Sequence, residues 1–94
     1  MAEQSVLTGK TVVITGASSG IGEAVSRMAH RLGANVALAA RSADKLEAMA
    51  RELGSRASAW VLDVADEEAA EKVFRHIRER LGPVDVLINN AGFG

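Results

Sequence analysis

A glycine-rich corner near the amino end of the chain has the residue types and spacing that bind phosphate. The run from Thr15 to Gly22 follows an apolar stretch that begins at Thr11 and precedes a helical apolar pattern that Gly33 ends. Glycines at a strand-to-helix corner let the backbone approach a phosphate, and the helix amino end offers N–H groups and partial positive charge. The pattern therefore predicts a nucleotide-phosphate site.

Three more apolar runs end in residues that could contact a ligand. Arg41 follows the second run, Asp63 and Val64 follow the third, and Asn90 follows the fourth. Because parallel strands place their carboxyl ends at one edge of a sheet, we expect these residues to converge. The runs extend from Asn35 to Ala40, from Ala57 to Leu62 and from Val84 to Asn89.

Helical periods separate the four runs. Ser42 and Asp66 stand at the predicted N-caps of the second and third helices, and Gly54 and Gly82 stand at their ends. Helices between successive strands require parallel pairing and right-handed crossovers. The sequence thus predicts an α/β fold, half of a doubly wound βαβαβαβ sheet with four parallel strands in the order 3-2-1-4. The corners after strands one and four would then meet where the strand order reverses.

Composition restricts the class of protein. The chain has 94 residues, a net charge of −1 and no cysteine. We expect one domain spanning residues 1–94, with no nucleic-acid partner, no disulfide and no metal site. Residues 1–10 lack an apolar signal core, and no window reaches the roughly 18 apolar residues of a membrane span. We therefore expect no membrane partner and a cytoplasmic location.

The corners together resemble the N-terminal half of a short-chain dehydrogenase/reductase. The matching features are the Thr15-Gly16-x-x-x-Gly20-x-Gly22 run, Arg41, Asp63-Val64 and the strand-four segment that ends at Gly92. One glycine motif is weak support, but four motifs at four predicted strand ends are specific. The resemblance covers residues 7–92 and implies a truncated dinucleotide-binding domain of the Rossmann type.

The resemblance also implies roles for individual residues. The glycine corner would hold the pyrophosphate of NAD(P), and Asp63 would accept a hydrogen bond from the adenine amino group, with Val64 near the ring. The strand-four residues would stabilise the sheet and let the adenosine ribose lie close to the backbone. The expected cofactor contacts are Gly16, Ser18, Ser19, Gly20, Ile21, Gly22, Arg41, Asp63, Val64, Asn90, Ala91 and Gly92.

The end of the second strand favours NADP(H) over NAD(H). An acidic residue at this place accepts hydrogen bonds from the ribose hydroxyls and repels a 2′-phosphate. Here the position is Ala40, followed by Arg41, whose guanidinium can pair with a phosphate.

The catalytic residues of the family have no counterpart in this chain. Members use a serine, a tyrosine and a lysine four residues after the tyrosine, with the tyrosine as general acid/base. This chain has no tyrosine. We therefore expect an oxidoreductase fragment with a cofactor site, no catalytic residue and no activity by itself.

The sequence leaves two alternative functions open. Gly16-Ala17-Ser18-Ser19-Gly20 also matches a G-x-S-x-G nucleophile elbow, which would make Ser18 a hydrolase nucleophile if His30 or His76 could reach it. The second alternative is a non-catalytic module that binds a nucleotide or self-associates. The fourth strand would be an open apolar edge, so we expect it to pair with another copy or with a missing C-terminal half.

Overall fold

The structure is a computed structural model, and it describes residues 6–90. Strands and helices alternate along the chain, as the sequence predicts. The strands are β1 (Thr11–Thr15), β2 (Asn35–Ala40), β3 (Ala57–Val61) and β4 (Val86–Asn89). The helices are α1 (Gly20–Arg31), α2 (Ala43–Leu53) and α3 (Glu67–Leu81).

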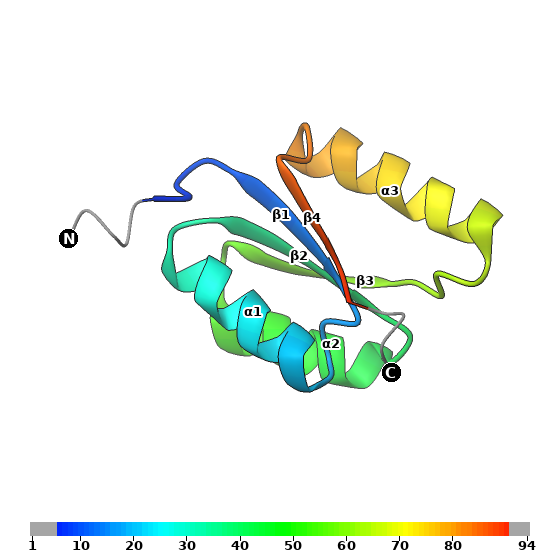
Figure 1. Cartoon of the computed structure of the whole chain (residues 1–94), viewed down its shortest axis with the longest axis horizontal. Helices are drawn as coiled ribbons and strands as arrows, with labels where there is room; N and C mark the ends of the chain where they lie inside the picture. The colour runs from blue at the N-terminus through cyan, green and yellow to red at the C-terminus, as the bar shows by residue number, and fades with distance from the viewer. Residues whose placement is uncertain (1–5, 91–94) are drawn as a thin grey trace.

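The four strands form one parallel sheet in the order β3-β2-β1-β4. Val13 of β1 is in register with Ala37 of β2 on one side and with Leu87 of β4 on the other. Figure 1 shows α1 and α2 on one side of the sheet and α3 on the opposite side. The predicted strand order and the Rossmann-like α/β class are confirmed, and the corners after β1 and β4 lie next to each other.

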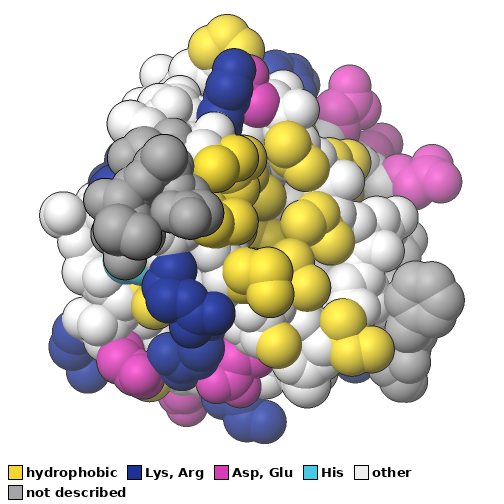
Figure 2. Space-filling model, turned by 60° about the vertical axis from the view of Figure 1, so that its left-hand side comes forward, with side chains coloured by type: hydrophobic (Ala, Val, Ile, Leu, Met, Phe, Trp, Pro, Cys, Tyr) yellow, Lys and Arg dark blue, Asp and Glu magenta, His cyan; other side chains and the backbone are white. Residues whose placement is uncertain are grey.

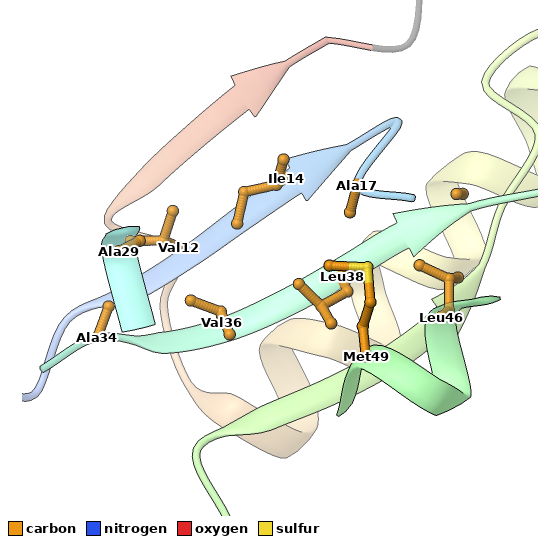
Figure 3. Packing of buried hydrophobic residues seen from close by; sticks show 10 residues of the cluster. Val12, Ile14, Ala17, Ala29, Ala34, Val36, Leu38, Leu46 and Met49 are labelled. Carbon is orange, nitrogen blue, oxygen red and sulfur yellow. The ribbon is translucent and has the colours of Figure 1, made fainter. Parts of the chain in front are cut away.

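Apolar side chains from alternate strand positions fill a separate core on each face of the sheet. On the first face, Ile14 and Leu38 are buried beneath α1 and α2, as Figure 3 shows, together with Leu46 and Met49 of α2. On the second face, Ile77 of α3 is buried against the sheet. Both faces of the central strands are covered, which is why their sequences are almost continuously apolar.

The helices begin at the predicted N-caps. The Asp66 carboxylate accepts a hydrogen bond from the Ala69 N–H at 3.1 Å, so this cap is confirmed in full. Ser42 stands at the N-cap of α2, but its hydroxyl makes no capping hydrogen bond. The first turn of α2 therefore has no side-chain cap from Ser42.

An ion pair connects the two helices on the first face. Arg27 of α1 contacts Glu52 of α2 at 2.9 Å and Glu23 of its own helix at 3.0 Å. The hydrogen bonds to Glu52 and Glu23 raise the pKa of Arg27, and the bond from Arg27 lowers the pKa of Glu52. This pairing shows that the Arg27 flank of α1 faces α2.

Two strand boundaries differ from the prediction. β3 ends at Val61, one residue before Leu62, and β4 begins at Val86 rather than at Val84. At the start of β4, the Asp85 carboxylate accepts the Thr11 N–H at 2.8 Å, while the Asp85 N–H donates to the Thr11 carbonyl. The Asp85 side chain thus accepts the Thr11 N–H. If β4 began earlier, a main-chain carbonyl before Asp85 would accept this N–H instead.

β4 is the least covered strand. Val86 is 40% exposed and Leu87 is 53% exposed, whereas all but the first residue of β2 are buried. Figure 2 shows apolar side chains gathered into a patch on the side of the molecule that carries α1 and β4. The predicted open apolar edge is therefore present in the part of the chain that the structure describes.

Candidate functional site

A cleft of about 440 Å³ lies at the carboxyl ends of the strands, beside the glycine corner. Its walls come from the segments that follow β1, β2, β3 and β4, so residues from the whole chain converge there. This position, at the point where the strand order reverses, is where ligands bind in open α/β sheets. The lining residues are Thr15, Gly16, Ser18, Ser19, Ala39, Ala40, Arg41, Ser42, Leu62, Asp63, Val64, Ala65 and Asn90.

The glycine corner opens the cleft. Gly16 has a φ of 64°, a left-handed conformation that residues with a side chain seldom adopt, and this turns the chain from β1 toward α1. Ser19 is the N-cap of α1, yet its hydroxyl donates to the Gly16 carbonyl at 3.1 Å instead of capping the helix. The first-turn N–H groups of α1 are therefore left for an anion, which the helix dipole favours.

Gly22 permits the close approach of three segments. A Cβ at this position would overlap the Gly16 carbonyl oxygen and lie 2.7 Å from Asn90 Nδ2. Asn90 Nδ2 itself donates to the Gly16 carbonyl at 3.2 Å. The third glycine of the motif thus makes room for the contact between the first helix and the end of β4.

Thr15 joins the ends of β1 and β4. Its hydroxyl accepts the Asn90 N–H at 2.9 Å and donates to Asn89 Oδ1 at 2.9 Å. Together with the Asn90–Gly16 bond, these contacts set the position of the glycine corner relative to β4. The corner is fixed before any ligand arrives, so a ligand need not order it.

Arg41 and Ser42 form the wall after β2. Both are exposed, and the cleft residues that β2 contributes, Ala39 and Ala40, carry no charge. The Arg41 guanidinium can donate to an anion. The Ser42 hydroxyl, which makes no capping hydrogen bond, can do the same. Among the lining residues, no carboxylate comes from this segment to oppose a phosphate.

Asp63 provides the carboxylate of the opposite wall, after β3. Its Oδ1 accepts the Ala65 N–H at 3.0 Å, which holds the turn, and its Oδ2 makes no hydrogen bond within residues 6–90. Val64 beside it is 40% exposed and lines the same cleft. The pair offers one acceptor and one apolar surface, which suits an amino-substituted heterocycle.

The cleft brings together seven of the twelve predicted site residues. Gly20, Ile21 and Gly22 stand in the first turn of α1 outside the lining, with Ile21 72% exposed and Gly22 buried. Ala91 and Gly92 lie outside the described residues. The seven residues in the cleft are Gly16, Ser18, Ser19, Arg41, Asp63, Val64 and Asn90.

Sequence reasoning missed some of the lining. Ser42 was expected only as a helix cap, and the lost capping bond is visible only in three dimensions. Leu62 and Ala65 also line the cleft. Because they flank the predicted contacts Asp63 and Val64 in the sequence, that adjacency could have predicted them. Thr15, the first residue of the motif, was not expected as a contact.

A hydrolase site is not supported by the positions of the histidines. Neither histidine lines the cleft beside Ser18. His30 is in the last turn of α1, roughly 15 Å along the helix axis from the glycine corner at 1.5 Å per residue. Partial burial, and secondarily the charge of Arg56, lower the pKa of His30. His76 is on α3, which covers the other face of the sheet.

Among residues 6–90, no group of three or more potential ligand side chains could hold a metal ion. Within the same residues, no helix is long and apolar enough to cross a membrane.

Comparison with known proteins agrees with the parallel sheet and its cleft. The family model for short chain dehydrogenases matches residues 10–94. The chain is 40% identical over 92 residues to a short chain dehydrogenase of Pseudocercospora fijiensis, covering 95% of this chain and 30% of the relative. It is 40% identical over 89 residues to an uncharacterized oxidoreductase of Staphylococcus aureus strain N315, covering 94% and 38%. It is also 40% identical over 86 residues to nodulation protein G of Rhizobium sp. strain N33, covering 92% and 35%.

The fold defines a protein of the Rossmann-like α/β class. The family match extends over most of the sequence, and the chain belongs to the short chain dehydrogenase family. It spans 30% to 38% of the length of the three relatives named above.

Proposed function

We propose that the cleft binds the adenosine and pyrophosphate part of NADP(H), and that it prefers NADP(H) to NAD(H). Family membership supports a nicotinamide dinucleotide as the ligand in general. The observation that carries the proposal is the convergence of the glycine corner, Arg41 and Asp63 on one cleft. Its volume of about 440 Å³ is within the usual range for small-molecule sites, roughly 300–1,000 Å³.

Each wall has a role in this proposal. The amino end of α1 and the hydroxyl of Ser18 face the pyrophosphate, because N–H groups and positive partial charge favour anions. Ser19 lines the same wall, with its hydroxyl bonded to the Gly16 carbonyl. Asp63 accepts from the adenine amino group, and Val64 packs against the ring. Asn90, which lines the cleft, lies along the ribose. The family resemblance implies the same role for Ala91 and Gly92, which are outside the described residues.

Arg41 and Ser42 provide the preference for the 2′-phosphate. Arg41 is exposed at the cleft, where its guanidinium can form a charge-assisted pair with a phosphate. Ser42 adds a hydroxyl donor that α2 does not use. NAD(H) has no 2′-phosphate, so neither Arg41 nor Ser42 gains an anionic partner from it. These two residues therefore strengthen the binding of NADP(H) only.

Isothermal titration calorimetry with NADP⁺ and NAD⁺ at low salt tests the preference. We expect NADP⁺ to bind about tenfold more tightly, equivalent to one charge-assisted contact of about 1.4 kcal/mol. Arg41→Ala should remove the difference while leaving NAD⁺ binding unchanged. The control is Arg51→Ala, which removes the same charge from an exposed position in the last turn of α2. Equal affinities in the unmodified chain, or a preference that survives Arg41→Ala, would contradict the proposal.

We further propose that the 94-residue chain alone does not transfer hydride. Its sequence has no tyrosine to act as the general acid/base that the family uses. The expected result is cofactor binding without any change in the absorbance of the reduced nicotinamide when carbonyl compounds are added. Turnover by purified chain would overturn this point and leave the binding proposal intact.

A further inference from the structure

The lining of the cleft carries little positive charge for the ligand proposed above. Among the described residues that line it, Arg41 is the one cation and Asp63 the one carboxylate, so their formal charges cancel. The glycine corner from Thr15 to Gly22 has no charged side chain. NADP(H) carries a 2′-phosphate as well as a pyrophosphate, so its binding gains from a further cation beside the cleft.

Lys45 is on the flank of α2 that faces α1. It precedes Glu52 by seven residues, which is close to two helical turns, so the two side chains share one flank. Glu52 contacts Arg27 of α1 at 2.9 Å. The flank that carries Lys45 is therefore turned toward α1.

The amino end of α1 is at the level of Lys45. Each helix leads from the carboxyl end of one parallel strand to the amino end of the next, so α1 and α2 run in the same direction (Figure 1). Gly20, the first residue of α1, precedes Arg27 by seven residues. Two turns back from the ion pair between Arg27 and Glu52, Lys45 therefore stands opposite the glycine corner.

The Lys45 side chain also leans toward the wall of the cleft. Ser42, the N-cap that lines the cleft, precedes Lys45 by three residues, the spacing of neighbours on one helix face. Helical side chains tilt toward the amino end of their helix, which directs the Lys45 stem toward Ser42. Lys45 is exposed, and it makes no ion pair with residues 6–90. Its ammonium group can therefore reach an anion at the edge of the cleft.

The position of Lys45 in the helix is unfavourable unless an anion is near. A cation in the first turn opposes the helix dipole, and Lys45 is the third residue of α2. No carboxylate is three or four residues away from it, and Glu23 and Glu52 both contact Arg27. Asp44 is in the same turn, but adjacent residues of a helix do not face each other. A phosphate bound beside the amino end of α2 would supply the missing negative charge.

We propose that Lys45 is a second cation of the cofactor site and that it contacts the 2′-phosphate of NADP(H) together with Arg41. This inference rests on the function proposed above and adds a residue from outside the cleft lining. Arg41 holds the phosphate at the amino end of α2, and the flexible Lys45 stem brings its ammonium to the same group. Lys45 contributes only when Arg41 has positioned the phosphate, so the two contributions are not additive.

Calorimetric titration with NADP⁺ and NAD⁺ at low salt tests the role of Lys45. Lys45→Gln should weaken NADP⁺ binding about threefold, as expected for one exposed charge pair, and leave NAD⁺ binding unchanged because NAD⁺ lacks the 2′-phosphate. Lys45→Arg keeps the charge and should retain most of the preference. The matched control is Lys72→Gln, which removes the same charge from an exposed position on α3, on the other face of the sheet.

The outcomes separate this inference from the function on which it rests. An unchanged NADP⁺ affinity in Lys45→Gln, or an equal loss for NADP⁺ and NAD⁺, would overturn the role of Lys45 only, provided that Arg41→Ala removes the preference. Equal affinities for the two cofactors in the unmodified chain would overturn both proposals. In the Arg41→Ala background, Lys45→Gln should change neither affinity. A further loss of NADP⁺ binding there would contradict the shared contact.

Urea denaturation of the ligand-free chain distinguishes a ligand contact from a structural role. Lysine and glutamine have similar helix propensities, and Lys45 opposes the dipole of α2. Lys45→Gln should therefore leave the unfolding midpoint unchanged or raise it slightly, while NADP⁺ binding weakens. A lower midpoint would show that Lys45 stabilises the helix, and it would overturn the inference.

Discussion

Strands β2 and β4 are both almost entirely apolar, yet they are held in the sheet by different means. β2 has a strand on each side and helices over both faces, so Leu38 is completely buried. β4 has one neighbour, and Leu87 is 53% exposed. The apolar pattern of a strand therefore indicates that it can be buried, and the cover around it decides whether it is.

Polar contacts at the two ends of β4 take the place of packing. At its amino end, the Asp85 carboxylate and N–H both bond to the backbone of Thr11. At its carboxyl end, Asn90 bonds to the Gly16 carbonyl and to the Thr15 hydroxyl. The contacts at the carboxyl end also shape the cleft, so the weakly packed strand and the ligand site depend on the same residues.

Gly22→Ala should produce the largest loss of stability, because it acts where β4 is most firmly attached. The new Cβ would overlap the Gly16 carbonyl and crowd Asn90, and backbone atoms cannot move aside without separating the corner from β4. We expect a loss of about 4 kcal/mol or more in the free energy of unfolding, measured by urea denaturation. Gly20→Ala is the control, since a Cβ there meets nothing within 4 Å. Similar losses from the two substitutions would show that the close approach is not critical.

Paired leucine substitutions compare the two strands themselves. Leu38→Ala leaves a cavity in a covered core and should cost about 3–5 kcal/mol, whereas Leu87→Ala should cost about 1 kcal/mol or less. Both unfolding curves are measured by urea denaturation at the same protein concentration. If Leu87→Ala destabilises as much as Leu38→Ala, β4 is packed more tightly than its exposure indicates.

Asp85→Ala should destabilise the protein less than Leu38→Ala and at least as much as Leu87→Ala. It removes the acceptor of the Thr11 N–H, a charge-assisted bond, and should cost about 1–2 kcal/mol in the free energy of unfolding. Asp85→Asn keeps an acceptor oxygen and should recover most of the loss. An unchanged unfolding midpoint in Asp85→Ala would show that packing, rather than this bond, holds the start of β4.

The helices and strands, and the meeting of the strand ends at one edge of the sheet, could be predicted from the sequence. They depend on patterns among residues that are close together in the chain. Glycine positions, the Asp66 cap and strand-to-helix alternation lead to a parallel sheet, and such sheets bring Gly16, Arg41 and Asp63 to one edge. The start of β4 was misplaced, since a carboxylate of the same segment replaces a ladder carbonyl. The role of Ser42 was also missed, because a serine at an N-cap looks the same whether or not its hydroxyl makes the capping bond.

The sequence by itself determined the class of fold, the strand order and the corner residues that form the cleft, because these follow from periodicity and from turn chemistry between neighbouring residues. Only the tertiary structure decided which apolar strand is covered and which polar groups hold β4 to β1. Those properties depend on distances between residues more than 70 positions apart, such as Thr11 and Asp85. No local pattern encodes such distances, and only the folded backbone sets them.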